Sequence, residues 1–166
     1  MNVLNVHRRD LAVSADEAAI LIDSLSSPND RLWPSRTWPA MRFDGPLRRG
    51  AEGGHGPIRY RVLEYEKGRR ATFGFTAPTG FNGTHAFTLT PLPSSSGCRL
   101  EHRIAMSTSG RATLSWWLVF RPLHDALIEE ALDQASQAFG KAVLVPHRRS
   151  KWVRLLRFLL GRRRPA

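Results

Sequence analysis

Four stretches in the middle of the chain alternate apolar and polar residues at every second position. They lie at residues 58–64, 72–76, 84–90 and 99–106. Because successive side chains of a strand point to opposite faces, each stretch predicts a β-strand with one apolar and one polar face. Short turn-like sequences separate the four strands, which favours antiparallel neighbours. The sequence thus predicts a sheet whose apolar face must be covered by another element.

The stretch 123–140 predicts that covering element. Apolar residues recur in it at three- and four-residue steps, which is typical of an amphipathic helix, and Gly140 would end the helix. The preceding residues 112–120 are apolar nearly all round, so they are expected to be buried or to close over something apolar. Pro122 would break or kink the join, or begin the second helix in its first turn. We therefore expect a long helix held by the sheet.

The N-terminal part completes an α+β order. Residues 2–13 have strand character, and Ser14 with Glu17 forms a capping-box signature for a short helix. Residues 28–33 predict a second short helix or turn, and 41–47 a weak strand. The expected order is a strand, two short helices, several antiparallel strands and a long C-terminal helix.

Length and cysteine content limit the class of protein. A chain of 166 residues suits one domain with a substantial core. The lone cysteine, Cys98, excludes an intrachain disulfide framework and fits a reducing compartment. No secretory-signal pattern and no apolar run of membrane-spanning length is visible. We expect a cytoplasmic protein.

The charge divides the chain into two parts. The formal net charge is +11, and nine basic residues lie from Lys141 onward, where there is no Asp or Glu. This leaves only +2 on residues 1–140. A nucleic-acid-binding domain would be expected to spread basic charge over its folded face. We predict a nearly neutral domain over 1–140 and a separate basic tail over 141–166.

Several stretches resemble the START-like superfamily, often called SRPBCC, which includes polyketide cyclases and dehydrases. The stretches 38–47, 54–70, 81–91 and 118–135 are similar to those of its uncharacterised bacterial members, and the likeness covers roughly residues 1–140 without one catalytic motif. The resemblance implies a helix-grip fold. In that fold a curved antiparallel sheet of about six or seven strands wraps around the long C-terminal helix and encloses a cavity. Members bind lipids, sterols or aromatic polyketides; some catalyse cyclisation or dehydration, and many only carry or sense the ligand.

The apolar strand faces and the gripping helix supply the candidate ligand-binding residues. Such a surface gives affinity through apolar area and orientation through a few polar groups. The alternative is a filled core in which the same residues pack against the helix; the resemblance favours a cavity. The candidates are Tyr60, Val62, Phe73, Phe75, His85, Phe87, Leu89, His102, Ile104, Met106, Trp116, Leu127 and Ala131.

His85 and His102 are the sharpest polar candidates. If residues 91–97 close a hairpin, Phe87 lies opposite His102 and His85 lies one diagonal step away. The two imidazoles could hydrogen-bond a ligand carbonyl or phenol, or one could act as a general base while Tyr60 orients a carbonyl. The alternative is two structural histidines. No third ligand stands at metal spacing, so we expect no metal and no cofactor.

Trp116 and Trp117 are adjacent in the apolar segment before Pro122. They could form a lid over the cavity mouth or insert into a membrane surface. The alternative is core packing with one partly exposed ring.

The tail predicts a short basic amphipathic helix. Its basic residues share one side and its apolar residues the other, which suits the interface of an anionic membrane. Each basic residue near such a surface contributes about 1 kcal/mol. A docked or disordered helix with solvated arginines is the alternative, and capture of nucleic acid ranks last. The candidate membrane-binding residues are Lys151, Trp152, Arg154, Leu155, Arg157 and Leu159.

Three functions remain open on the sequence. The leading hypothesis is a non-catalytic START-like carrier that takes an apolar ligand into the cavity while its tail rests on the inner membrane. The rival is an enzyme of the polyketide cyclase or dehydrase type with His85 or His102 as base. The third is a structural membrane-associated protein with a filled core and no ligand.

Overall fold

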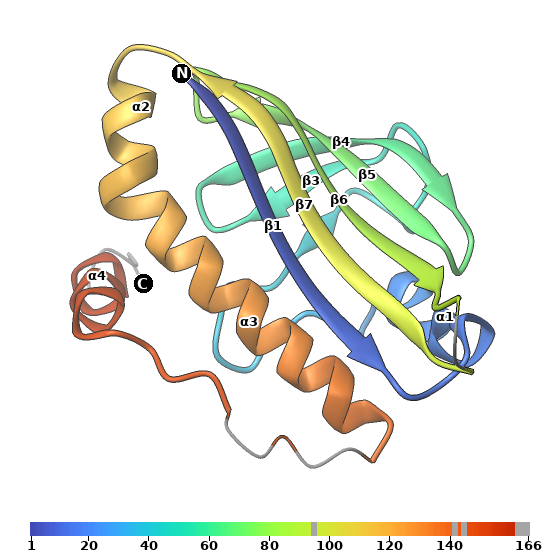
Figure 1. The fold of residues 1–166 in the computed structure, drawn as a ribbon. Coiled ribbons are helices and arrows are strands. Elements are labelled where there is room, and N and C mark those ends of the chain that lie inside the picture. Colours follow the sequence, from blue (N-terminus) through green and yellow to red (C-terminus); the bar gives the residue numbers. More distant parts are fainter. Residues whose placement is uncertain (94–95, 141–142, 144–145, 162–166) are drawn as a thin grey trace.

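The computed structural model describes residues 1–93, 96–140, 143 and 146–161, and shows one antiparallel sheet packed against a long helix (Figure 1). The sheet has seven strands in the order β1-β7-β6-β5-β4-β3-β2. Strands β2 to β7 each pair with the next strand along the chain, and β1 pairs with β7 at one edge of the sheet. This confirms the predicted α+β class. The strands are β1 (Asn2–Leu11), β2 (Arg42–Phe43), β3 (Glu52–His55), β4 (Ile58–Glu66), β5 (Arg70–Ala77), β6 (Phe81–Pro91) and β7 (Cys98–Thr108).

The pairing of β6 with β7 has the register that the sequence predicts. Phe87 lies opposite His102, and His85 lies opposite Ile104. On the other side of β7, the β1 residue opposite His102 is His7. Alternate residues of these strands point into the sheet–helix space, so the register brings three histidines to one region of the interior.

One short helix follows β1. It is α1 (Ala15–Asp23), and the Ser14–Glu17 capping box is present as predicted. The second short helix expected over 28–33 is absent; turns occupy those residues. The carboxylate of Asp30 accepts the backbone N–H groups of Ser26, Leu32 and Trp33 at 2.7–2.9 Å, and these bonds hold turns in place of a helix.

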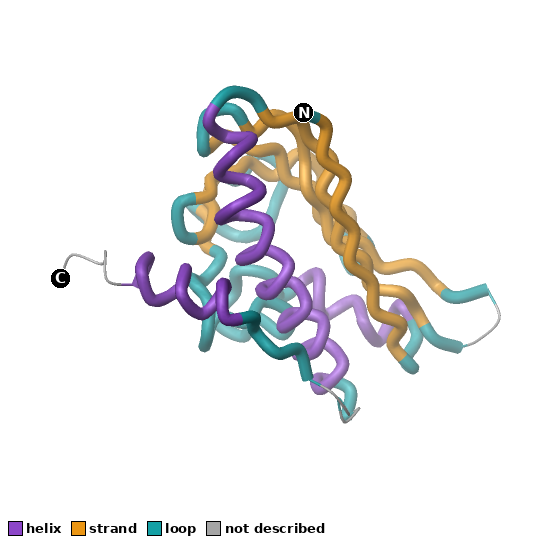
Figure 2. The backbone as a smooth tube through the Cα atoms, turned by 60° about the vertical axis from the view of Figure 1, so that its left-hand side comes forward, coloured by secondary structure: helices purple, strands orange, loops and turns teal. Residues whose placement is uncertain are grey.

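The C-terminal helix is continuous but not uniform (Figure 2). It consists of α2 (Arg111–Ser115), a π-helical turn η1 (Trp116–Phe120) and α3 (Arg121–Ala138). Pro122 lies in the first turn of α3. Proline has no backbone N–H, so it cannot donate to the Leu118 carbonyl as an α-helical residue would. That carbonyl instead accepts a hydrogen bond from the Trp152 indole at 2.8 Å.

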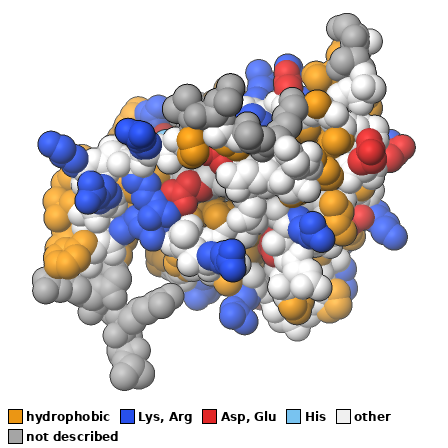
Figure 3. All heavy atoms as spheres, turned by 90° about the horizontal axis from the view of Figure 1, so that it is seen from below, with side chains coloured by type: hydrophobic (Ala, Val, Ile, Leu, Met, Phe, Trp, Pro, Cys, Tyr) orange, Lys and Arg blue, Asp and Glu red, His pale blue; other side chains and the backbone are white. Residues whose placement is uncertain are grey.

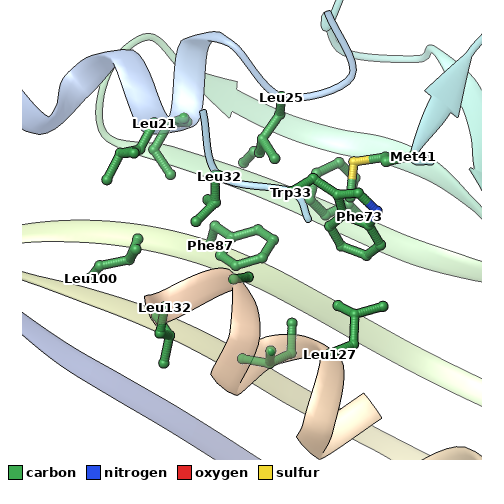
Figure 4. Packing of buried hydrophobic residues seen from close by; sticks show 14 of the residues in the cluster. Leu21, Leu25, Leu32, Trp33, Met41, Phe73, Phe87, Leu100, Leu127 and Leu132 are labelled. Atoms are coloured by element: carbon green, nitrogen blue, oxygen red, sulfur yellow. The ribbon is translucent and has the colours of Figure 1, made fainter. Parts of the chain in front are cut away.

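The core lies between the sheet, α1 and α3 (Figure 4). Leu21 of α1 and Leu25 of the turn after it face Phe87 of the sheet, and α3 adds Leu127 and Leu132 from the other side. All five side chains are at most 4% exposed. Burial of each such side chain contributes about 1.5–3 kcal/mol, so this packing holds α3 on the sheet.

The tail contains a helix, α4 (Lys151–Gly161), that packs against α3. Its Val153 and Leu156 are only 4% and 6% exposed. The guanidinium of Arg157 lies 4.1 Å from the centre of the Trp38 ring. The division into 1–140 and 141–166 stays a prediction, but α4 is seated on the folded domain. Within the described residues, no helix combines the length and apolarity needed to cross a membrane.

Candidate ligand-binding site

Five of the six histidines of the chain lie in or beside the space between the sheet and α3. Their rings follow one another across the interior: the His85 and His102 centroids are 5.5 Å apart, and those of His102 and His124 are 5.0 Å apart. His7 lies 5.8 Å beyond His124, and His55 lies on the other side of Tyr60 from His85. The fold thus places a row of polar histidine rings in the otherwise apolar space between the sheet and α3.

The His85–His102 pair is the most deeply buried part of this row. The two residues are 4% and 2% exposed, and Nδ1 of His85 lies 3.4 Å from Nε2 of His102. Their other nitrogens, His85 Nε2 and His102 Nδ1, have no hydrogen-bond partner among the described residues. A buried polar atom without a partner costs about 1–3 kcal/mol, so such atoms call for a functional explanation.

The pair is neutral near pH 7 because burial lowers the pKa of both imidazoles well below the usual 6.5. In a neutral pair joined by one hydrogen bond, one ring donates and the other accepts. Each neutral ring has one donor and one acceptor nitrogen, so the two remaining nitrogens are always one acceptor and one donor. That combination matches a hydroxyl group, and its donor alone matches a carbonyl oxygen.

Aromatic side chains surround the pair. The Tyr60 ring meets His85 edge-on at 4.7 Å, Phe73 stacks on it at 4.8 Å, and Phe87 contacts His102 at 4.6 Å. The Tyr60 hydroxyl lies 3.1 Å from Nδ1 of His55, and burial raises the pKa of Tyr60 so that it stays neutral. The hydroxyl predicted to orient a carbonyl therefore has a protein partner.

His55 is a member of this site that the sequence analysis did not select. It lies 4.7 Å from the ring of Trp33, and burial lowers its pKa to about 3. The structure places it in β3 with its ring against Tyr60. The signal that could have revealed it is pairing of β3 with β4, which the glycines conceal.

An ion-pair cluster ends the row where β1 meets α3. Nδ1 of His7 lies 2.7 Å from Glu129, and Nε2 lies 3.1 Å from Asp125. Burial disfavours the charge on His7, but the hydrogen bonds to both carboxylates outweigh it and raise its pKa. Two carboxylate partners require both ring nitrogens to donate, which is the imidazolium form. The sequence analysis did not select His7 or the two carboxylates. The sequence signals that could have indicated them are the inward position of His7 in β1 and the four-residue spacing of Asp125 and Glu129, which puts both on one face of the helix.

The same cluster contains the group of described residues that could hold a metal ion. Ligand atoms of His7, His124 and Asp125 all lie within 4.8 Å of one another. Two imidazoles and one carboxylate are a donor set that zinc accepts. Here the ion pairs already occupy both nitrogens of His7, so we assign the cluster to holding β1 against α3.

The structure brings the thirteen predicted ligand-binding residues together. All of them except the half-buried Phe75 are buried, and they form the walls of one interior. Trp116 is among the buried side chains, whereas its neighbour Trp117 is 49% exposed. The adjacent tryptophans therefore divide between core and surface.

A groove of about 490 Å³ lies on the surface near one end of the long helix. It lies between the β5–β6 turn and α2–η1, and its apolar lining includes Pro78, Ala112, Leu114, Leu118 and Val119. The groove was not predicted, because it depends on how a turn meets a helix start.

Aromatic rings lie between the groove and the histidine pair. Phe81 follows the groove's turn and contacts Phe120 at 5.2 Å, Trp116 at 6.0 Å and Phe75 at 5.9 Å. Phe75 in turn lies 5.0 Å from the ring of His85. These four rings separate the groove from the buried imidazoles.

Comparisons with known proteins bear on the fold. Neither a family model nor a curated protein matches the sequence. A Thermobifida fusca protein solved by NMR matches with a TM-score of 0.64 at 16% identity, over 89% of this chain and 99% of that one. CalU16 from Micromonospora echinospora matches with a TM-score of 0.56 at 18% identity, over 97% and 92% of the two chains. Norcoclaurine synthase from Thalictrum flavum matches with a TM-score of 0.60 at 12% identity, over 86% and 88%. With the curved sheet and its long helix, these likenesses show that the chain shares the helix-grip fold of these proteins.

Proposed function

We propose that the protein binds a small apolar molecule carrying a hydroxyl or carbonyl oxygen. The ligand would lie between the sheet and α3, with its oxygen against His85 and His102. The observation that carries this proposal is the buried imidazole pair, whose two outer nitrogens lack partners inside an aromatic wall. A ligand oxygen would satisfy those nitrogens, and the rings of Tyr60, Phe73 and Phe87 would supply apolar contact.

The groove gives the ligand a route to the pair. Phe81 and Phe120 would have to move apart to admit it, since their rings are in contact. Phe120 belongs to η1, and π-helical turns are common at functional sites. We propose η1 as the part of the helix that yields when a ligand enters.

A cyclase- or dehydrase-type enzyme is the second candidate. Norcoclaurine synthase, which shares the fold, is by its name an enzyme. An efficient general base has a pKa near the working pH, whereas burial keeps the pKa of His85 and His102 well below it. The pair is therefore better suited to hydrogen bonding than to proton abstraction, and we place binding first.

We also propose that the tail lies at an anionic membrane surface. Lys151, Trp152, Arg154, Leu155 and Leu159 are all exposed, which supports five of the six predicted contacts. Arg157 has another role, because its guanidinium lies on Trp38 and donates to the Thr37 carbonyl at 2.6 Å.

Two matched ligands test the binding proposal. 1-Naphthol carries one hydroxyl, and naphthalene lacks it. Titration of the protein should show 1-naphthol binding about tenfold more tightly, the effect of satisfying buried polar atoms. The double variant His85→Leu with His102→Leu should lose this preference and still bind naphthalene. His147→Leu, in the tail, is the control and should behave as wild type. Failure of both ligands to bind, or a preference that survives the double substitution, would refute the proposal.

A further inference from the structure

Five large apolar side chains are exposed on neighbouring parts of α2, η1 and α4. Leu114 is 64% exposed and Leu118 is 50% exposed; Trp152, Leu155 and Leu159 of α4 are 46%, 45% and 50% exposed. We refer to these five residues as the apolar patch. Single exposed apolar residues are ordinary, but a cluster of large ones marks a surface that another body covers.

The patch is one surface because α4 is fixed beside η1. The Trp152 indole donates to the Leu118 carbonyl at 2.8 Å. Val153 and Leu156 turn the other side of α4 into the core, so the remaining apolar residues of that helix face outward. Leu114 and Leu118 stand four residues apart, which puts them on one face of their helix. Figures 1 and 2 show α4 next to the long helix, crossing it at a steep angle so that its C-terminal end points away from the domain.

The surroundings of the patch are basic. No Asp or Glu occurs in residues 102–124 or 141–166. Arg111, Arg148, Lys151 and Arg154 are exposed there. Figure 3 shows Lys and Arg side chains gathered with hydrophobic side chains at the end of the molecule that carries α4. Basic residues around exposed leucine and tryptophan complement a lipid surface, where acyl chains take the apolar groups and anionic headgroups take the charges.

The patch also borders the groove, which is proposed above as the ligand's route to the interior. Leu114 and Leu118 line the groove and belong to the patch, and Arg111 lines the groove from the basic border. A body that covers the patch therefore covers the groove.

We propose that the apolar patch binds the surface of an anionic lipid bilayer and turns the groove towards the lipids. This inference rests on the ligand-binding function proposed above. In this orientation the groove faces the bilayer, so the ligands would be molecules dissolved in the lipid phase. The proposal extends the membrane-binding surface beyond the tail to Leu114 and Leu118, which the sequence does not single out.

Flotation with vesicles tests the surface. The vesicles contain phosphatidylcholine with or without phosphatidylserine, and the protein is used as the full chain without added ligand. Leu114→Ser with Leu118→Ser should reduce binding to the anionic vesicles at least tenfold. Leu4→Ser is a matched control, since Leu4 of β1 is 65% exposed, and it should bind as wild type. Equal binding by the Leu114/Leu118 variant and wild type would overturn the proposal. The proposal would also be overturned if the wild-type protein formed a dimer in solution that did not bind vesicles, and if the Leu114/Leu118 variant were a monomer.

A fluorescent label tests the orientation. Cys98 is fully buried, so a cysteine introduced at exposed Thr79 in the groove can be labelled with an environment-sensitive nitrobenzoxadiazole group. Anionic vesicles should raise and blue-shift its emission, and a label at Glu66→Cys should not respond. Equal responses at both positions would contradict the orientation. Titration with 1-naphthol in vesicle-free buffer reports on the interior alone, so failure of the membrane surface and failure of ligand binding are distinguished.

Discussion

Nδ1 of His85 lies 3.4 Å from Nε2 of His102 inside the hydrophobic core, and their two other ring nitrogens have no partner among the described residues. Leucine in both places would pack with a similar volume and leave no unpaired polar atom. The histidine pair is therefore a cost to stability that ligand binding explains.

Replacing both histidines should stabilise the fold. His85→Leu with His102→Leu removes all four imidazole nitrogens, so the free energy of unfolding should equal or exceed that of wild type by about 1 kcal/mol. His102→Leu alone leaves both nitrogens of His85 unpaired and should cost about 1–3 kcal/mol. Urea unfolding measures both. A double variant less stable than the single one would contradict the assignment of these atoms.

The attachment of β1 to α3 should weaken as the pH rises. The pKa of His7 is raised on folding, so its charged form stabilises the fold fully below the unfolded value of 6.5, and this contribution is lost as the pH rises through the folded value. The difference in unfolding free energy between wild type and His7→Gln should therefore shrink above pH 6.5. A difference that stays constant through that range would show that His7 is not the imidazolium that joins Asp125 and Glu129.

Glu130 should hold the tail in place. Its carboxylate accepts hydrogen bonds from Arg149 at 2.5 and 2.6 Å and from the Trp38 indole at 3.0 Å. Glu130→Gln removes the charge, which for a half-buried pair costs about 1 kcal/mol and should speed tryptic cleavage near Lys151 about fivefold. Glu66→Gln, at an exposed position, is the control. Identical cleavage of the two variants would argue against this contact.

Gly80 should be sensitive to the smallest substitution. Its φ is +92°, and an added Cβ would lie 2.7 Å from the Ala112 Cβ and 2.9 Å from the Ser109 carbonyl oxygen. Gly80→Ala should cost about 1–3 kcal/mol and displace α2 from the turn that forms the groove. Gly45→Ala, with nothing within 4 Å, should be nearly neutral in the same urea titration. Equal stability of the two variants would contradict the close approach of turn and helix.

Much of the fold follows from local patterns in the sequence. Alternation predicts β4 to β7, and the capping residues Ser14 and Glu17 predict α1. The short helix expected over 28–33 fails because the Asp30 side chain competes for backbone N–H groups. β3 was not predicted, because its two glycines interrupt the alternation of apolar and polar residues. Its strand conformation is stabilised by pairing with β4 and not by local strand propensity.

The site is predictable where it depends on register and not where it depends on tertiary contact. Alternation suffices to place His85 and His102 in the interior and Phe87 opposite His102. The His7 cluster needs β1 to pass beside α3, and the apolar patch needs α4 to dock beside η1. Neither juxtaposition follows from the spacing of residues along the chain, because 118 residues separate His7 from Asp125.

The imidazole nitrogen resonances of His85 and His102 test the central claim most directly. Nitrogen-15 NMR of histidine-labelled protein, titrated with 1-naphthol, reports on the two nitrogens assigned to the ligand. We predict saturable shifts of His85 Nε2 and His102 Nδ1, no such shifts with naphthalene, and an unchanged His147. Saturable binding of 1-naphthol that leaves both resonances in place, or no binding at all, would contradict the proposed site.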